Sequence, residues 1–153
     1  MTSKEVRQYA LTGGLLLGAY LFGKKILESL NIIETKDEKE SGENINKEIN
    51  DCIKKGKPTK TKGEWQIIAE NIYEAMKYSG TDENIVFMNV MRVKNNADFC
   101  SLFKTYGQRQ LYVFALPEGG KRNLIQAVNS ELSKSYITKI NNSYANKNIK
   151  YRF

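Results

Sequence analysis

The chain has 153 residues, of which 41% are hydrophobic, so it is long enough to bury the core of one ordinary domain with a small appendage. It carries 24 lysines and arginines against 17 aspartates and glutamates, a formal net charge of +7, which leaves nucleic acid, phospholipid headgroups and acidic protein surfaces open as partners. It contains no histidine, which excludes histidine-based catalytic triads, histidine-ligated zinc and histidine pH switches.

The N-terminal region contains an uncharged apolar stretch, Tyr9–Gly23, which is closed by two lysines. As a helix, this stretch would span about 22 Å, shorter than the ~30 Å hydrocarbon core of a bilayer. A secretory signal, a short membrane anchor and a helix that packs against protein are the three interpretations. Ala10, Gly14 and Gly18 recur every four residues and form a small-residue stripe that allows another helix to approach closely. We therefore assign residues 1–33 as an apolar anchor or packing helix.

Residues 34–63 are predicted to be a charged linker that contains a short amphipathic helix. The run TKDEKESGEN, residues 35–44, is highly charged and short of apolar side chains, which is typical of a flexible segment. Apolar side chains then recur at helical spacing, at Ile45, Ile49, Cys52 and Ile53.

Five lysines cluster where this linker ends, namely Lys54, Lys55, Lys57, Lys60 and Lys62. A solvated loop is the simpler interpretation, and phosphate contact with nucleic acid or lipid headgroups is the alternative. No aromatic residues are interleaved with these lysines, so the sequence offers no base-stacking surface. We therefore predict a solvated loop.

Residues 64–153 are predicted to form an all-α domain. The first helix carries an apolar face made of Trp65, Ile68, Ala69, Ile72, Ala75 and Met76. A corner follows, at which Gly80 is expected to take a positive φ and Thr81 to cap the next helix. That second helix, Ile85–Val93, is apolar nearly all round, which predicts a central, buried helix.

Four further helices are predicted from shorter apolar stripes. The third carries Phe99, Leu102, Phe103 and Tyr106, with Gly107 as its C-cap. The fourth covers Gln108–Leu116 and is followed by a turn at 117–120. The fifth covers 124–132, and the sixth begins near Ser133 or Ser135. The tail, Ile149–Phe153, alternates apolar and basic residues, so we expect it to lie extended across a five- to six-helix bundle.

No catalytic constellation is predicted. The two cysteines, Cys52 and Cys100, form no CxxC motif, a pattern that favours free thiols in a reducing compartment, and Cys100 is predicted to be a core residue. Without histidine, neither thiol has the usual base that would activate it. Asp82 and Glu83 are expected to serve the start of a helix, where their charge opposes the helix dipole. We therefore predict a protein that is not an enzyme.

The stretch from Ile72 to Ser133 resembles one annexin repeat. The matching pieces are Met76-Lys77, Gly80-Thr81-Asp82-Glu83, Ile85, Phe103-Lys104-Thr105-Tyr106-Gly107 and Leu111. The resemblance implies a compact unit of about five helices. It also implies calcium, which annexins hold with carbonyl and carboxylate oxygens and which bridges them to phospholipid.

Carried over by position, the calcium ligands would be the carbonyl oxygens of Met76, Tyr78 and Gly80 and the carboxylate of Glu118. Tyr78 stands where the family has glycine, which makes a tight ligating loop harder to form. The chain also has one repeat where annexins stack several. The sequence therefore favours a structural corner, with calcium as a weaker hypothesis and no other cofactor.

The overall layout resembles that of small bacteriophage virion proteins, with an N-terminal apolar helix, a charged linker, one helical domain and an aromatic-basic end. The resemblance implies a non-enzymatic structural or adaptor protein of the connector or tail region or of the particle interior, whose partners are other proteins of a symmetric assembly. The alternative is an annexin-like domain anchored to a membrane of a bacterial cell through Tyr9–Gly23, binding lipid or an envelope partner. Nucleic-acid binding is a third hypothesis, for which the sequence offers no motif.

Overall fold

The protein is described by a computed structural model that places residues 38–153, with side-chain surroundings from residue 46 onward. The predicted N-terminal helix and its small-residue stripe, Ala10, Gly14 and Gly18, lie outside the described residues. The chain divides into two units, of which the second is Ile49–Phe153. This unit begins inside the segment predicted as linker.

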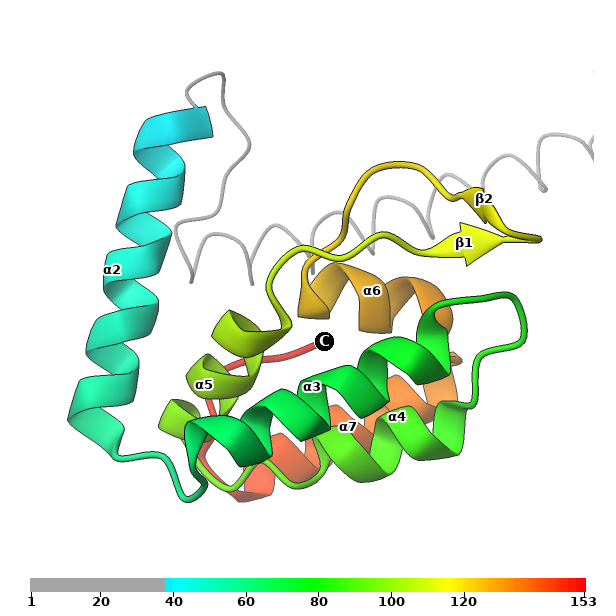
Figure 1. Ribbon diagram of the computed structural model, residues 1–153. Coiled ribbons are helices and arrows are strands. Elements are labelled where there is room, and N and C mark those ends of the chain that lie inside the picture. The colour runs from blue at the N-terminus through cyan, green and yellow to red at the C-terminus, as the bar shows by residue number, and fades with distance from the viewer. Residues whose placement is uncertain (1–37) are drawn as a thin grey trace, which may run out of the picture. The chain divides into compact units, whose positions relative to one another are not determined.

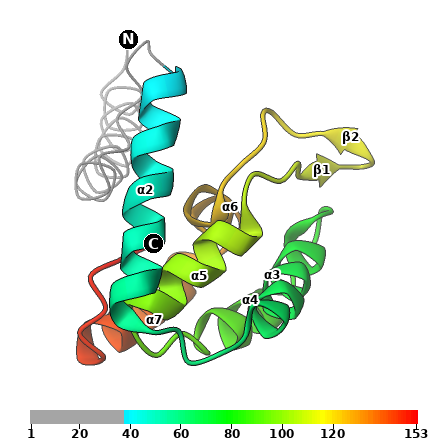
Figure 2. The same ribbon diagram turned by 60° about the vertical axis from the view of Figure 1, so that its left-hand side comes forward.

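The described part of the chain is helical, which confirms the predicted all-α class. Six helices and a two-stranded sheet lie between Glu38 and Phe153 (Figure 1): α2 (Glu38–Gly56), α3 (Lys62–Met76), α4 (Glu83–Val90), α5 (Asn96–Tyr106), β1 (Tyr112–Val113), β2 (Leu116–Pro117), α6 (Leu124–Glu131) and α7 (Lys134–Asn146). Helix α3 contacts both α4 and α5, α4 contacts α7, and α5 contacts α6. In both views the β1–β2 hairpin lies beside the loop that joins α3 to α4 (Figure 2).

Helix α3 begins with a capping box and buries the face that the sequence predicts. The Thr61 hydroxyl accepts a hydrogen bond from the Glu64 N–H, and the Glu64 carboxylate accepts one from the Thr61 N–H. Two N–H groups that the helix leaves without an internal partner are thereby satisfied. The side chains of Trp65, Ile68, Ala69, Ile72 and Met76 are each at most 3% exposed. Ala75, predicted on the same face, is half-buried.

The corner between α3 and α4 has the predicted glycine but a different cap. Gly80 has a φ of 92°, as expected. The N-cap of α4 is Asp82, whose carboxylate accepts a hydrogen bond from the Ile85 N–H at 3.1 Å. The hydroxyl of Thr81 instead donates to Glu131 at 2.8 Å. The cap prediction was wrong by one residue, because a contact with α6 engages the Thr81 side chain.

Helix α4 is not the buried central helix that its composition predicts. Val86 and Val90 are fully buried, but Ile85 is exposed and Met88 is 61% exposed. The contacts of α4 with α3 and α7 cover only part of its circumference. The prediction was wrong because it inferred burial from composition, whereas burial depends on which neighbours the fold supplies.

The predicted fourth helix over Gln108–Leu116 is absent, and an antiparallel hairpin takes its place. Tyr112 lies opposite Pro117, and Val113 lies opposite Leu116. A short apolar run carries no reliable period, so helix and strand cannot be told apart from spacing alone. Aromatic and β-branched residues at 112–114 favour a strand, and the helix prediction gave them too little weight.

The boundaries of the later helices agree with the predictions. Asn95 caps α5 and accepts a hydrogen bond from the Asp98 N–H, and Gly107 ends this helix with a φ of 63°. Helix α7 begins directly after Ser133. Phe103 was predicted to lie on the buried stripe of α5, but it is only half-buried.

The C-terminal tail is extended, as its alternating pattern predicts. Ile149, Tyr151 and Phe153 are buried, whereas the two residues between them are not. The Tyr151 ring stacks on Phe99, with ring centroids 4.3 Å apart. The Asn141 side chain exchanges two hydrogen bonds with the backbone of Phe153. The tail is therefore part of the core.

Cys52 in α2 and Cys100 in α5 form a disulfide, so the prediction of free thiols was wrong. Their Cα atoms are 6.3 Å apart, and the Tyr151 hydroxyl lies 3.0 Å from the Cys100 sulfur. The two cysteines are 48 positions apart, so no short motif announces the pair. Disulfides persist in oxidising surroundings, which speaks against the reducing compartment inferred from cysteine usage.

Helix α2 is longer than the short helix predicted within the linker. It begins at Glu38, inside the charged run 35–44 that was predicted to be flexible. Glutamate and lysine are good helix formers, so high charge alone does not exclude a helix. Within the second unit, Ile49 is buried and Ile53 is half-buried, in agreement with the predicted apolar stripe.

Replacing Trp65 with alanine should lower the free energy of unfolding by about 3–5 kcal/mol, because the indole fills the interior between helices. Ile67 lies on the same helix but is 64% exposed, so Ile67→Ala should change stability by no more than about 0.5 kcal/mol. Urea denaturation of both variants measures the difference. Equal losses would show that the faces of α3 are misassigned.

Reducing the disulfide should lower the free energy of unfolding by about 4 kcal/mol, because the bond closes a loop of 48 residues in the unfolded chain. Thermal melts with and without a dithiol reductant measure this loss. A Cys52→Ser variant should melt at the lower temperature in both conditions. Two free thiols in the oxidised, purified protein would contradict the pairing.

Candidate functional site

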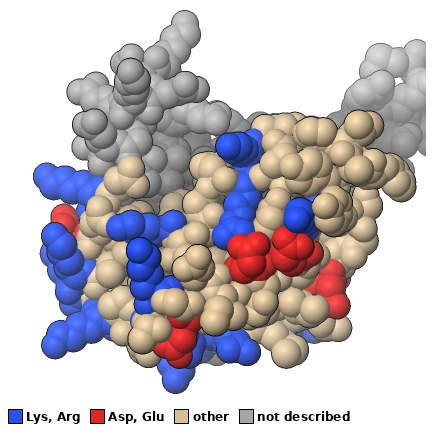
Figure 3. Space-filling view, viewed as in Figure 1, with Lys and Arg blue, Asp and Glu red and all other residues tan. Residues whose placement is uncertain are grey.

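The turn of the β1–β2 hairpin exposes the two most accessible large apolar side chains among the described residues. Phe114 is 86% exposed and Leu116 is 70% exposed. We call Val113, Phe114, Ala115 and Leu116 together the apolar tip. Figure 3 shows an uncharged surface at this side of the molecule, at the upper right. A contiguous apolar surface on a protein is a candidate site for contact with a partner.

The backbone of the apolar tip is unfavourable for the residues it carries. Phe114 and Ala115 have φ angles of 48° and 67°. Two positive φ angles in a two-residue hairpin loop are the pattern of a type I′ turn, which prefers asparagine, aspartate and glycine. A non-glycine residue in this region costs roughly 1 kcal/mol or more. Turn formation therefore does not explain why a phenylalanine occupies this position.

The hairpin is attached to the corner between α3 and α4. The Tyr112 N–H donates a hydrogen bond to the Lys77 carbonyl at 2.8 Å. The rings of Tyr112 and Tyr78 lie with their centroids 5.8 Å apart. Because Tyr78 is also exposed, its ring extends the apolar tip toward the corner.

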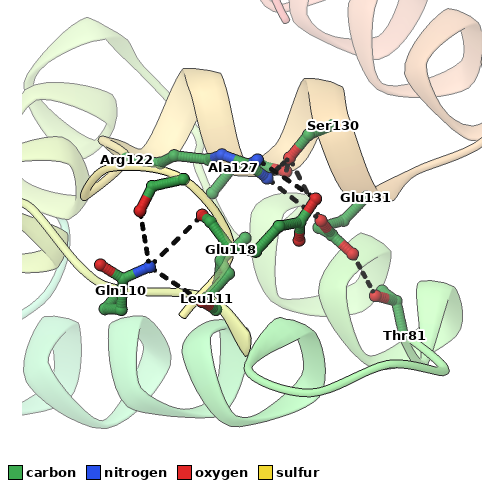
Figure 4. Close-up of polar contacts among 9 residues, drawn as sticks. Thr81, Gln110, Leu111, Glu118, Arg122, Ala127, Ser130 and Glu131 are labelled. Atoms are coloured by element: carbon green, nitrogen blue, oxygen red, sulfur yellow. Dashed lines mark hydrogen bonds and ion pairs between the residues drawn. The ribbon is translucent and has the colours of Figure 1, made fainter. Parts of the chain in front are cut away.

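A polar network holds the base of the hairpin (Figure 4). The Gln110 side-chain N–H group donates to the carbonyl oxygens of Leu111, Glu118 and Gly119 at 2.9, 3.3 and 3.2 Å. The backbones of Arg109 and Arg122 exchange two hydrogen bonds at 3.0 and 2.8 Å. These contacts fix the position of the base and hence the direction in which the apolar tip projects.

The Arg122 guanidinium joins the hairpin to α6 and to the corner. It lies 3.4 Å from the carboxylates of Glu118 and Glu131 and donates to the Ser130 hydroxyl at 2.8 Å. Glu131 in turn accepts the hydrogen bond from Thr81. Since these ion pairs are partly exposed, each contributes at most about 1 kcal/mol. Their main effect is to set the geometry of three segments.

The residues predicted as calcium ligands lie on three different segments, and the one carboxylate among them is paired with an arginine. Met76 is buried at the end of α3, Tyr78 and Gly80 lie on the exposed corner, and Glu118 follows β2. The Glu118 carboxylate is paired with Arg122, whose guanidinium already supplies the positive charge there. The carboxylate that contacts the corner is Glu131, which is paired with the same arginine. Among the side chains described, from residue 46 to 153, no cluster of three acidic, cysteine or histidine groups has an arrangement suited to a metal.

The five predicted lysines are distributed over two helices and the loop between them. Lys54 and Lys55 lie in the last turn of α2, Lys57 and Lys60 lie in the loop, and Lys62 opens α3. All are exposed except Lys60, which is half-buried. Only Lys57 and Lys60 therefore lie in the loop itself, whereas a loop was predicted for all five. The loop is nevertheless anchored, because Thr59 makes two hydrogen bonds to Asp98.

The segment of the predicted membrane contact, Tyr9–Gly23, lies outside the described residues. Within the part of the chain that the structure does describe, no helix has both the length and the apolar character needed to cross a bilayer.

Sequence reasoning missed the apolar tip and the arginine beneath it. Phe114 and Leu116 were assigned to a helix, so their exposure on a turn was not anticipated. Arg122 and Glu131 belong to no motif and meet only in the folded chain. The sequence did contain one signal, because Pro117 after an aromatic, β-branched run is compatible with an edge strand.

Comparisons with protein-family models, with curated proteins and with solved structures find no match to this chain. The resemblances to an annexin repeat and to phage virion proteins therefore rest on the sequence alone. Function has to be argued from the described sites.

Two buried tyrosines should respond oppositely to removal of their hydroxyl. Burial raises the pKa of both Tyr106 and Tyr144, so the stability that their neutral phenols contribute is present below about pH 10 and is lost as the pH rises further. The Tyr144 hydroxyl donates to the Val90 carbonyl, whereas that of Tyr106 has no hydrogen-bond partner among the described residues. At pH 7, Tyr144→Phe should cost about 1 kcal/mol and Tyr106→Phe should be neutral or stabilising, as measured by urea denaturation. A larger loss for Tyr106→Phe would show that its hydroxyl has a partner.

Proposed function

We propose that this chain is a non-enzymatic structural or adaptor protein that docks into a pocket of another protein through its apolar tip. The observation that carries the proposal is Phe114, an exposed aromatic residue in a turn whose backbone disfavours it. Aromatic anchors that enter a partner's pocket supply much of the binding energy of protein interfaces. Burying Phe114 and Leu116 would remove apolar surface from water at roughly 2 kcal/mol for each side chain.

The roles of the reactive side chains support a non-enzymatic protein. Asp82 caps α4, and the Glu83 carboxylate accepts a hydrogen bond from the Ser133 N–H. Glu118 is paired with Arg122, and Cys100 is part of the disulfide. These carboxylates and this thiol, the residue types that acid–base or nucleophilic catalysis would use, thus have structural partners.

The proposed location is a bacteriophage particle, where other proteins of a symmetric assembly are the partners. The sequence layout supports this location, and the disulfide is compatible with it, because disulfides persist on virion surfaces and in other oxidising surroundings. The apolar segment Tyr9–Gly23 would provide a second contact within the same assembly.

We also propose that the helical domain has a fold like that of one annexin repeat. The five helices α3 to α7 and the positive φ of Gly80 support it. The calcium site of that family is not included, because Glu118, the carboxylate on which it would depend, is paired with Arg122.

A Phe114→Asn substitution tests docking separately from folding. Asparagine tolerates the positive φ of this turn, so the variant should be as stable as the parent or more stable by up to about 1 kcal/mol. It should no longer sediment with the assembled particles when the full chain is produced with its natural partners. Gradient fractionation and thermal melts measure the two effects.

Ile67→Asn provides the matched control, because Ile67 is a similarly exposed apolar residue on α3. This variant should remain with the particles. Unchanged sedimentation of Phe114→Asn would overturn docking through the apolar tip. If the parent binds lipid vesicles and Phe114→Asn does not, while both remain with the particles, the result would instead support the alternative of a membrane-bound domain.

A further inference from the structure

Lysine-bearing segments from separate parts of the chain meet around the first turn of α5. The loop between α2 and α3 is tied there by Thr59, whose N–H and hydroxyl donate to the Asp98 carboxylate at 2.6 and 2.8 Å. The turn after α4 reaches the same carboxylate, because the Lys94 N–H donates to it at 2.9 Å. Through these hydrogen bonds the Asp98 carboxylate, which is fully buried, holds two lysine-bearing segments together.

Two more segments reach the same turn. The Lys150 N–H of the C-terminal tail donates to the Asn96 side chain at 2.8 Å. The end of α2 lies against α5 as well, since a Cβ at Gly56 would come within 2.7 Å of the Cβ of Ala97. The end of α2 with the loop that follows it, the turn after α4 and the C-terminal tail thus converge on residues 96–98.

We call the lysines on these segments the basic end, which comprises Lys54, Lys55, Lys57, Lys60, Lys62, Lys94 and Lys150. All of them are exposed except the half-buried Lys60. Figure 3 shows lysine and arginine side chains gathered at the left and lower left, around the end of α2 and the loop that follows it. The Asp98 carboxylate lies beneath this surface and is occupied by three hydrogen bonds.

We propose that the basic end binds the phosphate backbone of nucleic acid without regard to base sequence. Lysine ammonium groups act as point charges that neutralise phosphates and release counterions. The seven side chains that define the basic end are all lysines, which lack the fork of donors with which arginine reads base edges in a bidentate way. The proposal is independent of the docking function assigned to the apolar tip.

The surroundings of the basic end favour nucleic acid over an anionic membrane. Stable binding at a bilayer surface combines basic residues with apolar side chains that enter the lipid. Among the described residues, no exposed large apolar side chain lies within 54–62 or next to Lys94 or Lys150. The apolar tip adjoins the other end of α3, which is about 22 Å long for its 15 residues. The two surfaces are therefore separate.

The test measures binding of the full chain to a labelled DNA duplex of about 20 base pairs by fluorescence anisotropy, between about 50 and 200 mM NaCl. Four to six phosphate contacts predict a slope of log K against log salt between about −3.5 and −5.5. A second duplex of unrelated sequence should bind with the same affinity.

Two triple variants distinguish binding by the basic end from a general effect of the net charge of the protein. Lys55→Gln, Lys57→Gln and Lys94→Gln together should weaken binding about tenfold or more and reduce the slope by up to about 2.7 in magnitude. The control combines Lys121→Gln, Lys134→Gln and Lys139→Gln, which removes the same charge from exposed positions elsewhere. The control should keep the slope of the parent, and thermal melts should confirm that both variants fold.

Equal weakening by both triple variants would overturn the proposal, because net charge would then account for binding. Absence of salt-dependent DNA binding by the parent would also overturn it. A last experiment measures binding of the parent and of both variants to phosphatidylserine vesicles by flotation. Vesicle binding that is lost in the basic-end variant, without DNA binding by the parent, would assign this surface to a membrane instead.

Discussion

The burial of Phe99 is the interaction on which the arrangement of the second unit depends. Its ring is fully buried and lies within 4.3 to 6.2 Å, centroid to centroid, of four other aromatic rings, those of Phe103, Tyr144, Tyr151 and Phe153. These rings come from α5, α7 and the C-terminal tail. Because Cys100 is the next residue, the disulfide ties α2 to the same place. One aromatic cluster and one covalent bond thus position segments from both ends of the unit.

This core gives α3 two different surroundings at its two ends. At the N-terminal end, Asp98 gathers lysine-bearing segments into the basic end. At the C-terminal end, Arg122 and Gln110 hold the base of the hairpin that carries the apolar tip. A helix is a rigid spacer, so a protein pocket and a phosphate backbone could be bound at the same time. Both proposals thus describe an adaptor with two binding surfaces.

Several polar side chains fix the local backbone geometry, whereas one turn departs from local preference. Asp98, Asn123 and Thr61 each satisfy backbone N–H groups at a helix start or loop. The Phe114–Ala115 turn contradicts local backbone preference. Sites at which a sequence departs from local preference are often functional, which is the reason for placing the docking contact there.

The sequence by itself determined the all-α class, the buried face of α3, the glycine that ends α5, the start of α7 and the alternating tail, because each depends on residues close together in the chain. It did not determine the hairpin, the exposure of Met88 or the true cap of α4. Those features depend on contacts with residues that are distant in the sequence, such as the hydrogen bond from the Thr81 hydroxyl to Glu131. The Cys52–Cys100 bond likewise required the tertiary structure, since the two cysteines are 48 positions apart. The sequence groups the five lysines of 54–62, but only the fold brings the segments of Lys94 and Lys150 to them.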